Sequence, residues 1–175
     1  MRWLALPVVL SLAFLSGCEK KEVEKRLPAL TASAITGEAV WNRIENEANW
    51  DSYGHWPGLD GLLPGQSPHG KFHEIYVNAP LLTALPIADR IAPDGSIIVK
   101  ENFDADKQPL NESVMVKVKG YDPEHGDWFW ASFDPDGKVQ VAGKVASCIA
   151  CHEGMKANDY IIIHSLDAPL TPGSD

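Results

Sequence analysis

Two cysteines and a histidine stand close together near the end of this 175-residue chain. Cys148-Ile149-Ala150-Cys151-His152 has the spacing C-x-x-C-H, and residues 153–175 follow it. This spacing is the attachment signature of c-type haem, because the two thiols add to vinyl groups and the adjoining imidazole reaches the iron. The motif therefore predicts one covalent haem c, attached through Cys148 and Cys151, with His152 as the metal ligand.

A redox-active cysteine pair and one half of a zinc site are the alternative interpretations of the motif. A zinc site of the common kind would need further ligands, and the sequence has no second C-x-x-C. The chain has three cysteines, an odd number for a disulfide framework. If Cys18 is modified as described next, the other two remain as the motif pair.

The first 29 residues have the composition of an export signal followed by a tether. Arg2 precedes an apolar run, 3–14, which is too short to span a bilayer and is typical of a signal peptide. The run leads to Leu15-Ser16-Gly17-Cys18, a lipobox in which the cysteine becomes the acylated first residue. We therefore expect a signal peptide over 1–17, a charged tether over 18–29, and a periplasm-facing bacterial lipoprotein anchored through Cys18. An ordinary secretory signal with an incidental cysteine is the alternative.

Acidic residues outnumber basic ones, 24 to 15, which gives a formal net charge of −9. No basic stripe is available to neutralise phosphates, so the charge argues against a nucleic-acid partner. The length that remains after the signal and the tether suits one domain over residues 30–175.

Hydrophobic periodicity predicts a β-rich domain. After a Gly- and Pro-rich loop at 53–70, five segments with strand-like alternation are bounded by turn formers: 71–78, 96–103, 113–121, 127–134 and 138–141. Helices are expected over about 30–50, within 80–90 and over 147–159, followed by an extended piece at 160–165. The sequence therefore predicts an α+β fold, with a mainly antiparallel five-stranded sheet packed with helices and haem c bound near the C-terminus.

A β-sheet domain that ends in C-x-x-C-H resembles the cytochrome P-460 family, which includes the β-sheet cytochromes c′-beta. The resemblance covers about residues 68–163. It is carried, in this order, by His69-Gly70, Ile75-Tyr76-Val77-Asn78, the DGSIIVKE stretch at 94–101, Met115-Val116-Lys117, Gly126-Asp127-Trp128, the C-x-x-C-H motif and Asp159-Tyr160. Common electron-transfer cytochromes instead carry the motif near the N-terminus, and the cytochromes c′ are helical.

The resemblance implies a haem held against the sheet, with His152 on the proximal side. Hydroxylamine-oxidising members join a lysine covalently to the macrocycle, and the lysine of the DGSIIVKE stretch is Lys100. An arginine of those members falls near His73, and their distal carboxylate falls near Glu112. Lys100, His73 and Glu112 are therefore the candidate catalytic residues, with His73 or Glu112 moving protons. His73 is alternatively an iron ligand or a solvated strand residue, and His69 is expected in a loop at the pocket rim.

The resemblance leaves three functions open. One is a haem protein that binds or oxidises small nitrogen species, hydroxylamine or nitric oxide, together with a periplasmic redox partner. The second is a nitric-oxide-binding or electron-transfer cytochrome without catalysis, and the third is a lipoprotein whose haem only stabilises the fold. An apolar distal face favours gas binding, an internal ligand favours electron transfer, and a polar open site favours catalysis. Family members are often dimers, so a homodimer is a further expectation.

Overall fold

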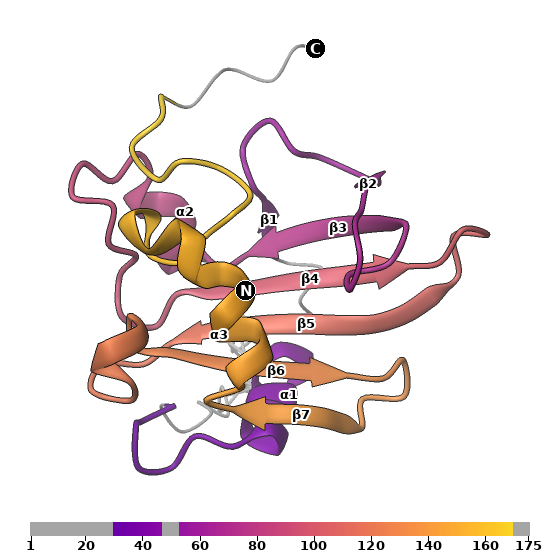
Figure 1. Cartoon of the computed structure of the whole chain (residues 1–175), viewed down its shortest axis with the longest axis horizontal. Helices are drawn as coiled ribbons and strands as arrows, with labels where there is room; N and C mark the ends of the chain where they lie inside the picture. Colours follow the sequence, from indigo (N-terminus) through magenta and orange to yellow (C-terminus); the bar gives the residue numbers. More distant parts are fainter. Residues whose placement is uncertain (1–29, 47–52, 170–175) are drawn as a thin grey trace, which may run out of the picture.

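A single antiparallel sheet organises the computed structural model, which describes residues 30–46 and 53–169 (Figure 1). The strand order is β1-β3-β4-β5-β6-β7, and β2 pairs with β3 beside that path. The expected signal peptide 1–17, the lipidation site Cys18 and the tether 18–29 lie outside the described residues. No helix within the described residues has the length and apolar character that crossing a membrane requires.

The α+β class and the mainly antiparallel sheet are confirmed, but the predicted strand number was too low. The five expected strands form as β3 (Phe72–Val77), β4 (Ile97–Phe103), β5 (Pro109–Lys117), β6 (Trp128–Phe133) and β7 (Val139–Gly143). Two more, β1 (Gly54–His55) and β2 (Leu63–Pro64), lie in the Gly- and Pro-rich segment and pair with β3. A strand of two residues has no periodicity, so the sequence pattern could not predict either one.

The helices are shorter than expected. They are α1 (Gly37–Asn46), α2 (Ala79–Ala84) and α3 (Ala146–His152), with 3-10 turns η2 (Pro123–His125) and η3 (Glu153–Asn158). The first helix begins late because Thr36 caps it: the Thr36 hydroxyl oxygen accepts the Ala39 N–H at 3.1 Å. Residues 47–50 of that expected helix lie outside the described part. The segment 160–165 contains no strand, contrary to the extended piece that was expected.

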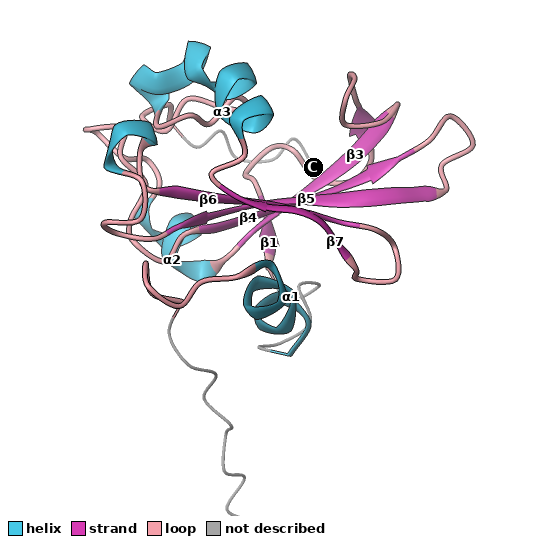
Figure 2. Ribbon diagram, turned by 60° about the horizontal axis from the view of Figure 1, so that its bottom comes forward, coloured by secondary structure: helices cyan, strands magenta, loops and turns pink. Residues whose placement is uncertain are grey.

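Different layers cover the two faces of the sheet, with α1 on one face and α3 on the other (Figure 2). Adjacent residues of a strand point to opposite faces. On β4, Val99 packs with Val40 and Ile44 of α1. Its neighbour Ile98 packs in the other core with Ile149 of α3. The sheet therefore separates two hydrophobic cores, and the C-x-x-C-H motif belongs to the face that α3 covers.

Candidate haem site

A cavity of about 430 Å³ lies on the α3 face of the sheet. Five strands (β2 to β6), the loop between β2 and β3, helix α3 and the segment 161–163 contribute to its walls. Its size falls within the roughly 300–1,000 Å³ of small-molecule and cofactor sites. Apolar side chains form much of the lining, among them Ile75, Ile98, Met115, Trp130 and Ile161.

Helix α3 brings the three residues of the motif to one wall of this cavity. Cys148, Cys151 and His152 are three and four positions apart, so they share a helix face, and all three line the cavity. Both thiols are free, with Cys148 half-buried and Cys151 exposed. The predicted grouping of these residues at one pocket is present in the structure, while the covalent attachment itself stays a prediction.

The orientation of His152 is fixed by a hydrogen bond behind it. Its Nδ1 donates to the Tyr160 carbonyl oxygen at 2.7 Å, so the lone pair of Nε2 is left for a metal. The ring also lies 4.8 Å from the Trp130 ring, between centroids, at an interplanar angle of 65°. A histidine held in one tautomer by a backbone carbonyl is the usual arrangement of a protein metal ligand.

The Tyr160 carbonyl is in turn held by a buried ion pair. Asp159 and Tyr160 have left-handed φ values of 52° and 64°. Lys117 Nζ lies 2.6 Å from both carboxylate oxygens of Asp159, and the side chains of the pair are 9% and 6% exposed. The Ala92 N–H donates to the same carboxylate at 2.8 Å, and Trp128 Nε1 donates to the Asp159 carbonyl at 2.8 Å. These four contacts stabilise the turn that presents Tyr160 to His152.

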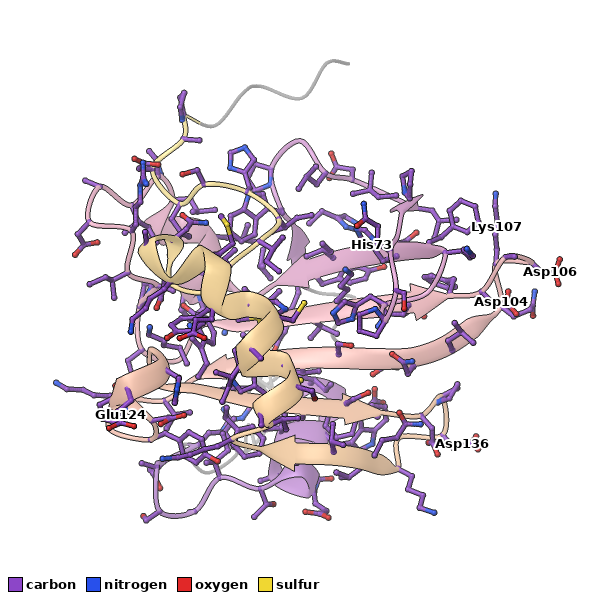
Figure 3. The ribbon with its side chains drawn as sticks, in the orientation of Figure 1. His73, Asp104, Asp106, Lys107, Glu124 and Asp136 are labelled. Atoms are coloured by element: carbon purple, nitrogen blue, oxygen red, sulfur yellow. The ribbon has the colours of Figure 1, made fainter. Side chains whose placement is uncertain are left out.

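Two of the predicted site residues, Lys100 and His73, line the cavity from the sheet side. His73 lies on β3, where Figure 3 labels it, and is only 6% exposed, so the solvated-strand interpretation is wrong. Neither ring nitrogen of His73 has a hydrogen-bond partner. Burial, followed by the charge of Lys100, lowers the pKa of His73 to about 4. Burial also lowers the pKa of Lys100, which increases the share of its neutral, nucleophilic amine.

Glu112 is the predicted site residue that the structure does not bring to the cavity. On β5 it precedes Ser113, whose side chain lines the cavity, so Glu112 points to the α1 face. There it stands directly across from Glu101, and burial, Glu101 and Glu45 together raise its pKa to about 7. The structure therefore does not bring Glu112 to the distal side, where the sequence prediction had placed it.

The sequence reasoning placed His69 only at the rim, but its ring reaches into the cavity. His69 Nδ1 lies 3.2 Å from Ser113 Oγ, and the ring centroid lies 6.5 Å from that of His152, with the two ring planes at 89°. Gly70 sets this position, because its φ of +77° brings it against the backbone of Phe103. The His69-Gly70 pair was the available sequence signal, since a glycine at positive φ marks a fixed turn.

The model of the family Cytochrome P-460 matches residues 50–163. The chain belongs to the cytochrome P-460 family. The matched range contains all seven strands and the C-x-x-C-H motif, so the resemblance inferred from the sequence is confirmed. A search of curated proteins gave no match. Family membership indicates a haem cofactor, while covalent c-type attachment and a single haem per chain stay predictions.

The residues of the cavity fit a haem. Two thiols and an oriented imidazole stand at one wall, the lining is largely apolar, and the buried ring nitrogens of His73 lack a protein partner. A bare metal ion fits less well. His69 and His73 have the spacing of a zinc-binding histidine pair. However, no three His, Cys, Asp or Glu side chains gather as metal ligands anywhere in 30–46 and 53–169.

Proposed function

We propose that this member of the cytochrome P-460 family is a periplasm-facing protein with one covalent haem c, which binds or oxidises hydroxylamine or nitric oxide at the iron. The observation that carries the proposal is a cavity with the C-x-x-C-H motif at one wall and polar side chains of the sheet at another. Cys148, Cys151 and His152 stand at one wall, and the polar side chains of His73 and Lys100 enter from the sheet. Haem iron supplies the redox chemistry when it is bound, and the chain supplies the axial ligand, pocket polarity and access.

His73 is our candidate for the residue that handles protons at this site. Oxidation of hydroxylamine releases protons as well as electrons, so a nearby acceptor helps the reaction. Neither ring nitrogen of His73 has a hydrogen-bond partner among the described residues, so either one can receive a proton from a bound substrate. A pKa lowered to about 4 makes this imidazole a weak base, so at pH 7 His73 would pass the proton on and return to its neutral form. The electrons would leave to a periplasmic redox partner.

Lys100 is our candidate for the covalent bond to the macrocycle. It lies in the middle of β4, opposite Ile75 on β3 and Ser113 on β5, and its side chain enters the cavity. A lysine whose charge is disfavoured by burial is a better nucleophile than an exposed one. These properties support the cross-linking role that the family resemblance implies.

A nitric-oxide-binding or electron-transfer protein without catalysis is the second candidate, and one observation favours it. With Glu112 on the other face, no carboxylate stands among the described residues that line the cavity. The histidines are then the available proton acceptors. Under this candidate neither a cross-link at Lys100 nor a proton-accepting role of His73 is needed.

The proposal includes export and anchoring. Residues 1–17 would direct secretion, Cys18 would carry the lipid, and 18–29 would space the haem domain from the membrane. Metabolic labelling with a radioactive fatty acid tests this part. Wild-type protein should be labelled and sediment with membranes, whereas Cys18→Ser should lose the label.

Mass spectrometry of the tryptic haem peptide tests the cofactor and the cross-link together. The peptide with Cys148 and Cys151 should carry haem, and a second peptide containing Lys100 should stay joined to it. Lys100→Met should keep the covalent haem but lose that second peptide, and the exposed Lys138→Met should change neither. Colourless protein whose two motif thiols react with iodoacetamide would refute the haem assignment.

Steady-state oxidation of hydroxylamine with an artificial electron acceptor separates the two candidate functions. Loss of a positioned proton acceptor typically costs about 100-fold or more, so His73→Ala should reduce kcat by at least that factor. A holoprotein with an ordinary ferrous c-type spectrum, no Lys100 peptide and no turnover would favour the carrier function.

A further inference from the structure

Two imidazoles from separate parts of the chain lie close together at the cavity. His152 ends α3, and His69 lies in the loop between β2 and β3. Their ring centroids are 6.5 Å apart, their planes are at 89°, and both side chains line the cavity. The described structure therefore places a second histidine in the cavity, close to the expected proximal ligand His152.

Both rings are held through Nδ1, which leaves Nε2 of each available. The Tyr160 carbonyl accepts from His152 Nδ1, and Ser113 Oγ lies 3.2 Å from His69 Nδ1. Ser113 Oγ also accepts from Asn102 Nδ2 at 3.1 Å. A hydroxyl oxygen can accept two hydrogen bonds, so this geometry suits a His69 that donates through Nδ1. Metal-ligating histidines generally have their other nitrogen fixed in this way.

The ring separation agrees with coordination of one metal from two sides. A metal–imidazole bond is about 2 Å, and the nitrogen lies about 1 Å from the ring centre, so two trans imidazoles have centroids about 6 Å apart. The observed 6.5 Å is close to that value. Haem iron accepts one axial ligand on each side of the macrocycle.

We propose that His69 is the second axial ligand of the haem iron in the resting protein. This inference rests on the proposed function, because it needs haem at His152. The loop that carries His69 is fixed at its base, since the Gly65 N–H donates to the Lys71 carbonyl at 2.7 Å and the Lys71 N–H to the Phe103 carbonyl at 2.8 Å. A small nitrogen ligand must then displace the His69 ring before it reaches the iron. His73, with two free nitrogens, remains inside the cavity to hydrogen-bond that ligand.

If His69 is bound to the iron, it competes with any external ligand for the same coordination position. The apparent affinity for an external ligand falls by the fraction of protein whose iron is open. If His69 is bound in nine molecules of ten, its removal should strengthen nitric oxide or cyanide binding by about 10-fold. The same competitor would make the resting haem suited to electron transfer until a ligand displaces it.

Electron paramagnetic resonance and optical spectra of the purified ferric holoprotein test the inference. Wild-type protein should be low-spin and six-coordinate at neutral pH. His69→Ala should become high-spin, free imidazole should restore the low-spin spectrum, and cyanide should bind about 10-fold more tightly than to wild type. The matched control His73→Ala removes a cavity imidazole that has no role as a ligand here, so it should stay low-spin.

Three results would overturn the inference. They are a wild-type ferric haem that is high-spin, a low-spin spectrum that survives His69→Ala, and a change to high spin caused by His73→Ala in place of His69→Ala. If His69→Ala fails to retain haem, the wild-type and His73→Ala spectra decide together. A low-spin spectrum that survives His73→Ala leaves His69 as the remaining cavity histidine opposite His152, and a high-spin wild-type spectrum overturns the inference. High-spin haem would leave the proposed function intact, whereas colourless protein would refute both proposals.

Discussion

Replacement of Asp159 by Asn tests whether the buried ion pair behind His152 stabilises the site. Asn has the same shape and keeps an oxygen for the Ala92 N–H, but it removes the negative charge that faces Lys117. The Lys117 side chain is 9% exposed, so its ammonium would remain in a poorly solvated place without its partner. Breaking one half of a buried ion pair typically costs about 3–5 kcal/mol.

We therefore expect Asp159→Asn to lower the free energy of unfolding by about 3–5 kcal/mol, a large part of the roughly 5–15 kcal/mol of a typical domain. At about 3 °C per kcal/mol for a chain of this size, the melting temperature should fall by about 9–15 °C. Urea unfolding of the holoprotein, followed by far-ultraviolet circular dichroism, measures the free energy, and a thermal scan measures the shift.

The double variant Lys117→Met with Asp159→Asn separates two effects on stability: the loss of the ion pair itself, and the cost of leaving the Lys117 charge buried without a partner. Removing both charges leaves no buried ion, so the double variant should recover about 2 kcal/mol relative to Asp159→Asn alone. Asp136→Asn, at the exposed turn after β6 (Figure 3), is the matched control and should change stability by less than about 0.5 kcal/mol. A loss below about 1 kcal/mol in Asp159→Asn, or a double variant no more stable than the single one, would refute the reasoning.

Three further predictions concern the α1 face, the loop before β3 and the motif itself. The pKa of Glu112 rises from 4.5 in the unfolded chain to about 7 in the fold, so the folded state binds more protons and its stability falls as the pH rises through that range. Glu112→Gln should remove this pH dependence. In urea titrations at pH 8 the variant should be about 1–2 kcal/mol more stable than wild type, after allowance for solvent screening. Gly70→Ala should lose about 2–4 kcal/mol by urea unfolding, because a Cβ at its positive φ would collide with the Phe103 carbonyl oxygen. Cys148→Ser combined with Cys151→Ser should leave haem that detergent extracts, seen as a lost haem stain after denaturing electrophoresis.

Each of these predictions has a control in the chain. Glu124→Gln replaces an exposed acid (Figure 3) and should keep the wild-type pH dependence of stability. Gly61 has a φ of +76°, but no atom lies within 4 Å of the place that a Cβ would take, so Gly61→Ala should cost only the conformational strain of about 1–2 kcal/mol. Ser147→Ala, next to the motif, should retain the haem stain. A Glu112→Gln profile that keeps the wild-type slope would contradict the assignment of that slope to this carboxyl.

The main strands of this fold were predictable from their residue types and hydrophobic pattern and from the turn-forming residues between them. Burial alternates along β3 and through most of β5, whereas β4 and β6 are rich in β-branched or aromatic residues and are buried on both faces for much of their length. The turn at Pro135-Asp136-Gly137 has residues suited to its backbone. The motif on α3 was predictable because its chemistry is local, contained in five consecutive residues. The short strands β1 and β2 were not, since they form only through pairing with β3.

Local sequence patterns could not predict which side chains form the sheet side of the cavity, because that depends on how the strands pair. Lys100, His73 and Ser113 share that wall only because three strands pair in one register, in which Ile75 and Ser113 flank Lys100. A shift by one residue would exchange the faces of a strand. A placement that is off by one position on β5 exchanges Ser113, which lines the cavity, for Glu112, which does not.

That single-residue difference decides which chemistry the cavity favours. With Glu112 inside, the distal wall would contain a carboxylate able to take protons from a bound substrate. With Ser113 inside, it instead contains a hydroxyl that fixes the ring of His69 opposite His152. This register therefore keeps the Glu112 carboxylate out of the cavity and places the Ser113 hydroxyl beside His69, the candidate second ligand. If both proposals hold, the register of β5 against β4 sets which side chain lies at the distal wall: a carboxylate that could take protons, or the hydroxyl that fixes the ring of His69.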